Sequence, residues 1–288
     1  MTTVWLEAAL NGPWGTDHQP NSPISVDDCI KQGIACAEAG AAIIHLHAYD
    51  DDGTEHHDAA IYADIIEGIQ NQVDAIVYPS IPLLGKPGVD GITPDERVAH
   101  QDALGDAELL EWAVVDPGSV NFSTYDDIEQ GMTGFVYRNP EAHIRAGLSV
   151  STTHGATPAY AIYEPGFIRL GAALHRQYPT LNQPIYRFMF SEKYTFGYPP
   201  EPYALDSCLT LLETETTTAP WMVSGLGVDI SPLIPEAVRR GGHVRVGLED
   251  APLESAHTNV ELVERACEQI EDCGGTLATA NDVRTELS

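Results

Sequence analysis

Two histidines separated by one residue, His45 and His47, lie at the end of an apolar stretch that reads I-I-H-L-H-A-Y-D. Branched apolar residues followed by acids and a glycine are typical of a buried strand that emerges into a loop. Alternate side chains share one face of a strand, so both imidazoles point the same way. One histidine in the core and the other in solvent is the simpler alternative. The H-x-H spacing at a strand end nevertheless favours a site for one divalent metal ion.

A second polar group ends the stretch H-V-R-V-G-L-E-D, which alternates as a strand over His243–Asp250 and places Arg245, Gly247 and Glu249 on one face. An arginine on an interior face is costly without a partner or an anionic ligand. We therefore interpret Arg245 as an anion-holding residue, with a structural ion pair to Glu249 as the alternative. For Glu249 and Asp250 the alternative is a solvated acidic loop.

The elements that must position these residues alternate between strand and helix along the whole chain. Alternating βα units imply parallel strands, and eight of them in 288 residues predict a closed (β/α)8 TIM barrel of the α/β class. We expect one domain over residues 1–288 with a short C-terminal helical extension at Asn281–Leu287. A doubly wound open sheet is the alternative, but no G-x-G-x-x-G follows the first strand and no Walker A sequence occurs. The expected strands are Val4–Leu10, Ile43–Asp50, Ala75–Ile81, Trp112–Asp116, Ala159–Glu164, Ile185–Glu192, Trp221–Gly227 and His243–Asp250; residues 124–137 are expected to form an inserted loop or hairpin.

Barrel closure determines which strand ends can meet. The active site of such a barrel lies at the C-terminal ends of the strands, and strand eight lies beside strand one, two places from strand two. Glu249 can then join His45 and His47 in a site with an open coordination position. Two imidazoles and one carboxylate suit Zn²⁺ acting as a Lewis acid, although other divalent ions remain alternatives.

The composition excludes several partners. Asp and Glu number 43 against 14 Lys and Arg, and a net charge of -29 argues against nucleic acid or an anionic membrane surface as a partner. The same balance predicts a protein adapted to high salt, where screening weakens self-repulsion. Five cysteines without a C-x-x-C motif, and no signal-peptide or membrane-span pattern, predict a reducing, cytoplasmic setting.

Beyond these inferences, the sequence resembles the β-keto acid cleavage enzymes, a family that includes 3-keto-5-aminohexanoate cleavage enzymes and was formerly a domain of unknown function. The resemblance runs end to end through H-L-H at 45–47, Pro79-Ser80, D-x-G-S-x-N-F at 116–122, Tyr163-Glu164-x-Gly166 and the highly specific G-G-H-V-R-V-G-L-E-D at 241–250. It implies a zinc-dependent barrel enzyme, usually a homo-oligomeric dimer or tetramer. The implied reaction joins a β-keto acid with acetyl-CoA to give acetoacetate and a new acyl-CoA.

The resemblance also implies residue roles. His45, His47 and Glu249 match the metal ligands, and Asp250 matches the carboxylate proposed as general base. Arg245 and Ser80 match residues that hold the keto acid. Asn121 matches the asparagine of the strand-four motif and is expected at the substrate.

This chain departs from the family pattern at four positions. Tyr49 replaces the arginine of H-x-H-x-R, and Val114 replaces a common threonine in strand four. Trp14 and Ala161 stand where carboxylates suit a cationic amine on the substrate. These replacements predict a substrate tail that is neutral or apolar, with Trp14 beside the substrate.

Two other functions compete with this interpretation. A hydrolase of the amidohydrolase type also uses H-x-H in a barrel, but on the first strand and with later strand-end histidines that strands five and six lack here. A non-catalytic barrel that binds a metal or metabolite is the second. Tight zinc binding without turnover of any keto acid would favour the latter.

Overall fold

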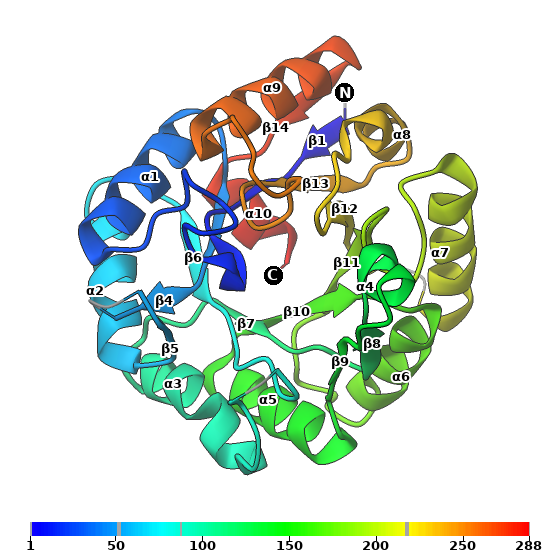
Figure 1. Cartoon of the computed structure of the whole chain (residues 1–288). Helices are drawn as coiled ribbons and strands as arrows, with labels where there is room; N and C mark the ends of the chain where they lie inside the picture. Colours follow the sequence, from blue (N-terminus) through cyan, green and yellow to red (C-terminus); the bar gives the residue numbers. More distant parts are fainter. Residues whose placement is uncertain (1, 51–52, 87, 217–218, 288) are drawn as a thin grey trace.

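The computed structural model describes residues 2–50, 53–86, 88–216 and 219–287 and confirms the (β/α)8 barrel. Eight parallel strands form a ring in the order β6-β3-β2-β13-β12-β11-β10-β7, and β6 and β7 lie side by side where the ring closes (Figure 1). The barrel strands are β2 (Leu6–Ala9), β3 (Ile43–Leu46), β6 (Ile76–Pro79), β7 (Trp112–Val114), β10 (Thr157–Ile162), β11 (Ile185–Phe190), β12 (Trp221–Gly225) and β13 (His243–Val246).

Helices surround the strands as an outer ring in Figure 1. Several begin at capping boxes, in which a threonine side chain accepts the backbone N–H three residues on and a glutamate reciprocates, as at Thr93–Glu96 and Thr258–Glu261. The ring consists of α1 (Val26–Glu38), α2 (Ala59–Gln70), α3 (Pro94–Asp106), α5 (Glu141–His154), α6 (Pro165–His175), α7 (Pro202–Glu215), α8 (Ile234–Arg239, after the 3-10 turn η2, Ser231–Leu233) and α9 (Asn259–Asp272). None of the helices in the described residues is both long and apolar enough to cross a bilayer.

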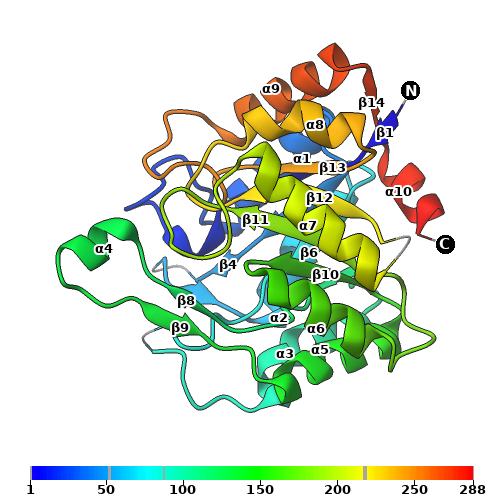
Figure 2. The same ribbon diagram turned by 90° about the vertical axis from the view of Figure 1, so that its right-hand side faces the viewer.

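Period-two alternation in the strands separates two buried layers. Residues such as Leu6, Ile44 and Val77 pack outward against the helices, whereas Trp5, Ile43, Tyr78, Trp112 and Met222 fill the barrel interior. At the N-terminal end of the strands, α10 (Ala280–Glu286) packs its Val283 against this interior cluster. The strands β1 (Thr2–Val4) and β14 (Gly275–Leu277) pair next to it, and Figure 2 shows all three at the end of the barrel opposite α4.

All eight barrel strands end before the residue that the sequence predicted, and three of them differ most from the prediction. The first divides at Trp5, because β1 leaves the barrel to pair with β14. The strand with the histidines ends at Leu46, and Ala48–Tyr49 (β4) turns into an antiparallel ribbon with Glu55–His56 (β5). The eighth strand ends at Val246, because Gly247 adopts φ +139° and lies against the carbonyl of Ala9, where a Cβ would come within 2.1 Å of the oxygen.

The segment expected as an inserted loop or hairpin over residues 124–137 belongs to a projecting arm, residues 120–137. In this arm β8 (Val120–Phe122) and β9 (Phe135–Tyr137) pair antiparallel, and the short helix α4 (Tyr125–Glu129) lies at their far end. Figure 2 shows the arm extending from the C-terminal end of the barrel. Its base borders the cavity described next.

Candidate active site

Three buried side chains converge at the C-terminal end of the barrel. His45 and His47 come from β3 and the residue just beyond it, and Glu249 comes from the turn that follows β13. The Nε2 atom of His45 lies 3.4 Å from Glu249 Oε2, and the Nε2 atom of His47 lies 3.7 Å from Glu249 Oε1. Each of the three residues offers one ligand atom, and these three atoms all lie within 4.8 Å of one another. The structure thus brings together the three residues that the sequence selected as metal ligands.

The donor set of this cluster fits a divalent metal ion. Glu249 Oε2 and His45 Nδ1 are buried and have no hydrogen-bond partner among the described residues. Burial lowers the pKa of His45 well below its usual value, so its imidazole is neutral and can offer a lone pair. A buried carboxylate oxygen without a donor is costly in an apolar interior, and a metal ion would compensate it.

His47 is held from two further directions. Its backbone N–H donates to Asn11 Oδ1 at 2.8 Å, and Asn11 Nδ2 donates back to the His47 carbonyl at 2.9 Å. Its Nδ1 lies 2.6 Å from Glu55 Oε1, an arrangement that turns Nε2 toward Glu249. Burial opposes protonation of His47, but Glu249 and Glu55 outweigh it and raise its pKa to about 9 without a metal.

Glu55 is a site residue that sequence reasoning did not select. The β4–β5 ribbon returns it beside His47, and its other oxygen lies 3.3 Å from Lys86 Nζ. Burial would raise its pKa, but the hydrogen bond to His47 and the neighbouring cations lower it to about 2. The carboxylate therefore stays ionised and accepts the His47 N–H.

Arg245 lies at the centre of a buried ion-pair network. Its Nε and Nη2 donate to the two oxygens of Asp250 at 2.9 and 2.7 Å, and Nη2 also lies 2.9 Å from Glu249 Oε1. Its Nη1 donates to Glu7 Oε1 at 3.1 Å. The ion pair with Glu249, which was the alternative interpretation, is present, and Arg245 also borders the cavity. Its anion-holding role stays a prediction.

Asp250 reaches Arg245 because the chain turns after Val246. Its carboxylate is buried behind Arg245 and does not line the cavity. Burial raises its pKa to about 6, with Arg245 opposing the shift. A carboxyl group that titrates near neutrality is suited to proton transfer.

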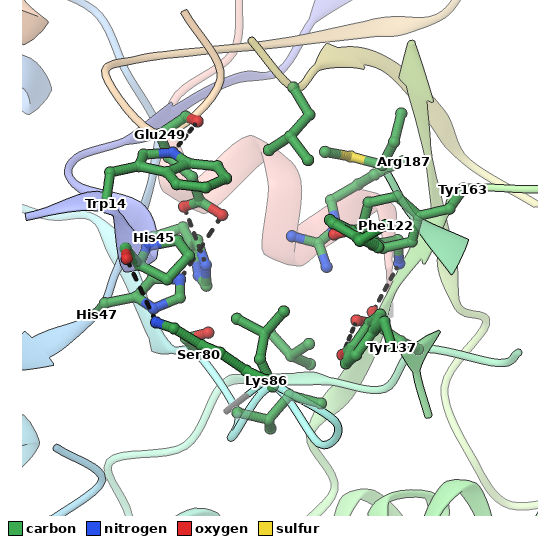
Figure 3. Close-up of a pocket in the computed structure, with 18 of the residues that line it drawn as sticks. Trp14, His45, His47, Ser80, Lys86, Phe122, Tyr137, Tyr163, Arg187 and Glu249 are labelled. Carbon is green, nitrogen blue, oxygen red and sulfur yellow. Dashed lines mark hydrogen bonds and ion pairs between the residues drawn. The ribbon is translucent and has the colours of Figure 1, made fainter. Parts of the chain in front are cut away.

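A cavity of about 250 Å³ opens beside this cluster (Figure 3). Ser80 lines it from the end of β6 and is buried. Trp14, in the 3-10 turn η1 (Gly12–Trp14), covers Glu249 and donates its Nε1–H to the Glu249 carbonyl at 2.8 Å. Gly12, at φ +62°, permits this approach, since a Cβ there would lie 2.6 Å from the Glu249 side chain.

Asn121 lies elsewhere. It is exposed in β8 and does not line the cavity, whereas its neighbours Val120 and Phe122 are buried. Strand alternation explains the outcome, because the cavity-facing side of β8 belongs to Phe122. The expectation that Asn121 borders the substrate is therefore not met in this structure.

Besides Trp14, the three other departures from the family pattern have distinct surroundings. Val114 and Ala161 line the cavity, opposite the metal-ligand cluster. Tyr49 is buried and its hydroxyl donates to the Gly12 carbonyl, so it supports the turn that carries Trp14.

The cavity wall opposite the metal-ligand cluster contains residues that sequence reasoning missed. Arg187 projects from β11, and Asp116 follows β7 with its oxygens accepting from Tyr137 Oη at 2.6 Å and Ala161 N at 3.1 Å. Figure 3 shows Arg187 between the His45–Glu249 side and an aromatic wall with Phe122. The lone arginine in the apolar run I-Y-R-F-M-F was the available signal. The remaining aromatic and aliphatic lining includes Phe135, Tyr137, Tyr163, Met189, Tyr194 and Leu226.

Comparisons with known proteins agree with the geometry. The chain is 29% identical over 295 residues to a 3-keto-5-aminohexanoate cleavage enzyme of Fusobacterium nucleatum, covering 100% of this chain and 98% of that protein. It is 26% identical over 275 residues to a 3-oxoadipate:acetyl-CoA acetyltransferase of Cupriavidus necator, covering 93% and 88%. The apo structure of ObcA matches the fold with a TM-score of 0.72 at 18% identity, over 93% of this chain and 65% of that one.

The family comparison covers nearly the whole sequence. The sequence model described as beta-keto acid cleavage enzyme matches residues 3–288, a range that includes every strand and helix of the barrel. Both the His45–His47–Glu249 cluster and the cavity beside it lie within this match. The chain is therefore an enzyme of the beta-keto acid cleavage enzyme family.

Proposed function

We propose that the protein converts a β-keto acid and acetyl-CoA into acetoacetate and a new acyl-CoA. The observation that carries the proposal is the convergence of His45, His47 and Glu249 at one side of a cavity that also contains the Arg245 guanidinium. The names of several relatives include acetyl-CoA as a partner in transfer. In the balanced reaction, R–CO–CH2–COO⁻ and CH3–CO–S-CoA exchange acyl groups and give CH3–CO–CH2–COO⁻ and R–CO–S-CoA.

Each site residue has a proposed role in this exchange. His45, His47 and Glu249 would hold Zn²⁺, which as a Lewis acid would stabilise negative charge on the keto oxygen. Ser80 and Arg245 contact the carboxylate of the keto acid. Asp250 is the proposed general base for the methylene between the two carbonyls, and its pKa near 6 suits that transfer at neutral pH. Because its carboxylate lies on Arg245 and does not line the cavity, this role requires the side chain to turn toward the substrate.

We propose further that the substrate tail is neutral or apolar. The tail leaves the metal-ligand cluster toward Val114 and the aromatic base of the arm, and Ala161 offers no carboxylate to an amine. Trp14 covers the opposite side and stacks on Tyr194, with ring centroids 6.4 Å apart. Walls of this kind favour burial of hydrocarbon over a solvated ammonium group.

The test is acetoacetate release by purified protein in high salt with zinc and acetyl-CoA, across apolar, acidic and amino β-keto acids. We expect release that requires acetyl-CoA, is highest for the apolar series, and is lost in Glu249→Gln. Exposed Glu141→Gln is the matched control. A folded, zinc-loaded protein that releases no acetoacetate would refute the proposed reaction. Preference for an amino-bearing acid would refute the proposal that the substrate tail is neutral or apolar.

A homo-oligomer is also proposed, with the arm as its contact surface. Four of the five large apolar side chains that are strongly exposed among the described residues lie on the arm: Tyr125, Ile128, Met132 and Val136, each 46–57% exposed. Apolar exposure of this kind marks interaction sites. Light scattering should give a dimer or tetramer that dissociates when Ile128 and Met132 are both changed to Glu. A wild-type monomer would refute this assignment.

A further inference from the structure

Arg187 is a buried cation on the inner face of the barrel. It is 2% exposed, and its register partner on β10 is Ala161, whose small side chain leaves the space beside the guanidinium open. Figure 3 shows the guanidinium directed toward the open centre of the cavity, across from His45 and Glu249. The proposed roles above make no use of this residue.

The guanidinium of Arg187 is poorly compensated for its burial. Its Nη1 donates to Tyr78 Oη at 2.9 Å and its Nη2 to the Ala159 carbonyl at 3.1 Å, whereas Nε has no partner among the described residues. Its one ion pair within the described chain is a long contact of 3.8 Å to Glu7 Oε1. A buried charge with idle donors is unfavourable unless a ligand completes it.

The neighbouring carboxylates are occupied elsewhere. Glu7 Oε1 already accepts from Tyr78 Oη at 2.6 Å and from Arg245 Nη1 at 3.1 Å. Asp116 also lines the cavity, but its two oxygens accept from Tyr137 and from the Ala161 backbone. Arg187 therefore has no dedicated carboxylate partner among the described residues.

Arg245 provides the contrast. A guanidinium has five N–H donors, and Arg245 directs four of them to Asp250, Glu249 and Glu7. Arg187 directs two to neutral oxygens, and its Nε–H has no partner among the described residues. Both guanidiniums reach the same oxygen, Glu7 Oε1, so they lie close enough to contact one small anion together.

We propose that Arg187 makes the main charge-assisted hydrogen bonds to the carboxylate of the β-keto acid, from the side opposite Arg245. The inference rests on the proposed function for the identity of the anion. A carboxylate there would complete the idle donors of Arg187 with charge-assisted hydrogen bonds while the keto oxygen faces the metal-ligand cluster. Arg245, held by three carboxylates, then mainly positions Asp250 and Glu249.

The test compares two ligands that differ in one charge. Acetoacetate, the product common to every substrate of the proposed reaction, and its methyl ester are titrated into the zinc-loaded protein without CoA, by calorimetry. The variants are Arg187→Met and Arg187→Lys, and the control is Arg169→Met, which removes an exposed arginine paired with Glu215 on the surface. Thermal melting and zinc content verify that each variant is folded and loaded.

We expect Arg187→Met to bind acetoacetate about 10- to 100-fold more weakly, with the affinity for the ester changed less than about twofold. Arg187→Lys should recover part of the loss, because lysine keeps the positive charge but lacks the paired N–H donors of the guanidinium. Equal weakening of both ligands would assign Arg187 a purely structural role and overturn the proposal, as would unchanged acetoacetate affinity. If Arg187→Met does not fold, the same comparison is made with Arg187→Lys: the loss of affinity for acetoacetate must exceed the loss for the methyl ester. Because no turnover is involved, this result is independent of whether acyl-CoA is formed.

Discussion

Changing Glu55 should weaken metal binding although Glu55 is not a ligand. Its Oε1 accepts the Nδ1–H of His47 at 2.6 Å, so it selects the tautomer in which Nε2 carries the lone pair facing Glu249. Glu55→Gln keeps a neutral acceptor for His47, whereas Glu55→Ala leaves the imidazole free to rotate or to change tautomer. In both variants Lys86 loses a carboxylate, but its side chain is 35% exposed and can be solvated.

The magnitude follows from the single contact that is lost. A hydrogen bond to a charged group contributes about 1.5–3 kcal/mol, and outer-shell partners of metal ligands typically account for about 10- to 100-fold in affinity. At about 1.4 kcal/mol for each factor of ten, we expect roughly a 10-fold weaker zinc affinity for Glu55→Gln and roughly a 100-fold weaker affinity for Glu55→Ala.

The assay is competition for zinc against a chromophoric chelator at pH 7.5. Glu141→Gln, which removes an exposed carboxylate from α5, is the control for the loss of one negative charge. Melting of the metal-free proteins separates an effect on metal binding from an effect on folding. Zinc affinity within twofold of wild type for Glu55→Ala would refute the role of this contact in orienting His47.

Three further outcomes are expected. His243 stacks on Trp5 and accepts the Trp5 backbone N–H at Nδ1, and burial lowers its pKa to about 3. Below pH 6.5 the unfolded state takes up a proton on His243 and the folded state does not. The contribution of His243 to the free energy of unfolding therefore decreases by about 1.4 kcal/mol for each pH unit as the pH falls from 6.5 to 3. Urea unfolding at several pH values should show a smaller dependence on pH for His243→Asn. Asn11→Ala removes the hydrogen bonds to the backbone N–H and carbonyl of His47 and should lower the free energy of unfolding by about 3 kcal/mol in urea. Asn21→Ala, whose Nδ2 lies 3.3–3.5 Å from its acceptors, is the control. Raising NaCl from 0.1 to 2 M should raise the melting temperature, because screening relieves repulsion at a net charge of -29, and a melting temperature unchanged by salt would contradict the high-salt interpretation.

The fold was predictable because its signals are local. Period-two runs and capped helices each lie within about fifteen residues, and their alternation is sufficient to indicate a barrel. Strand ends were less predictable. Gly247 stops β13 through contact with Ala9, a residue on the neighbouring strand, and no feature near Gly247 in the sequence reports that approach.

The candidate site was predictable where its residues lie at strand ends in recognisable motifs, as His45, His47 and Glu249 do. Glu7 and Arg187 were missed because they lie inside apolar runs, and their partners are far away in the sequence. Glu7 and Arg245, which form one hydrogen bond, are 238 residues apart in the sequence, and Arg187 and Tyr78 are 109 residues apart. Asn121 was placed in the site by its motif, but one step of strand alternation turns it outward.

The way the barrel closes has a consequence for its synthesis. Strand β2 lies between β3 and β13 in the barrel. A ribosome adds about 5–20 residues per second, so β2 waits roughly ten seconds to a minute for its second neighbour. During that interval the nascent chain is an open sheet with β2 at an exposed edge, a state prone to pairing with other chains. The net charge of -29 would keep such unfinished chains apart by mutual repulsion.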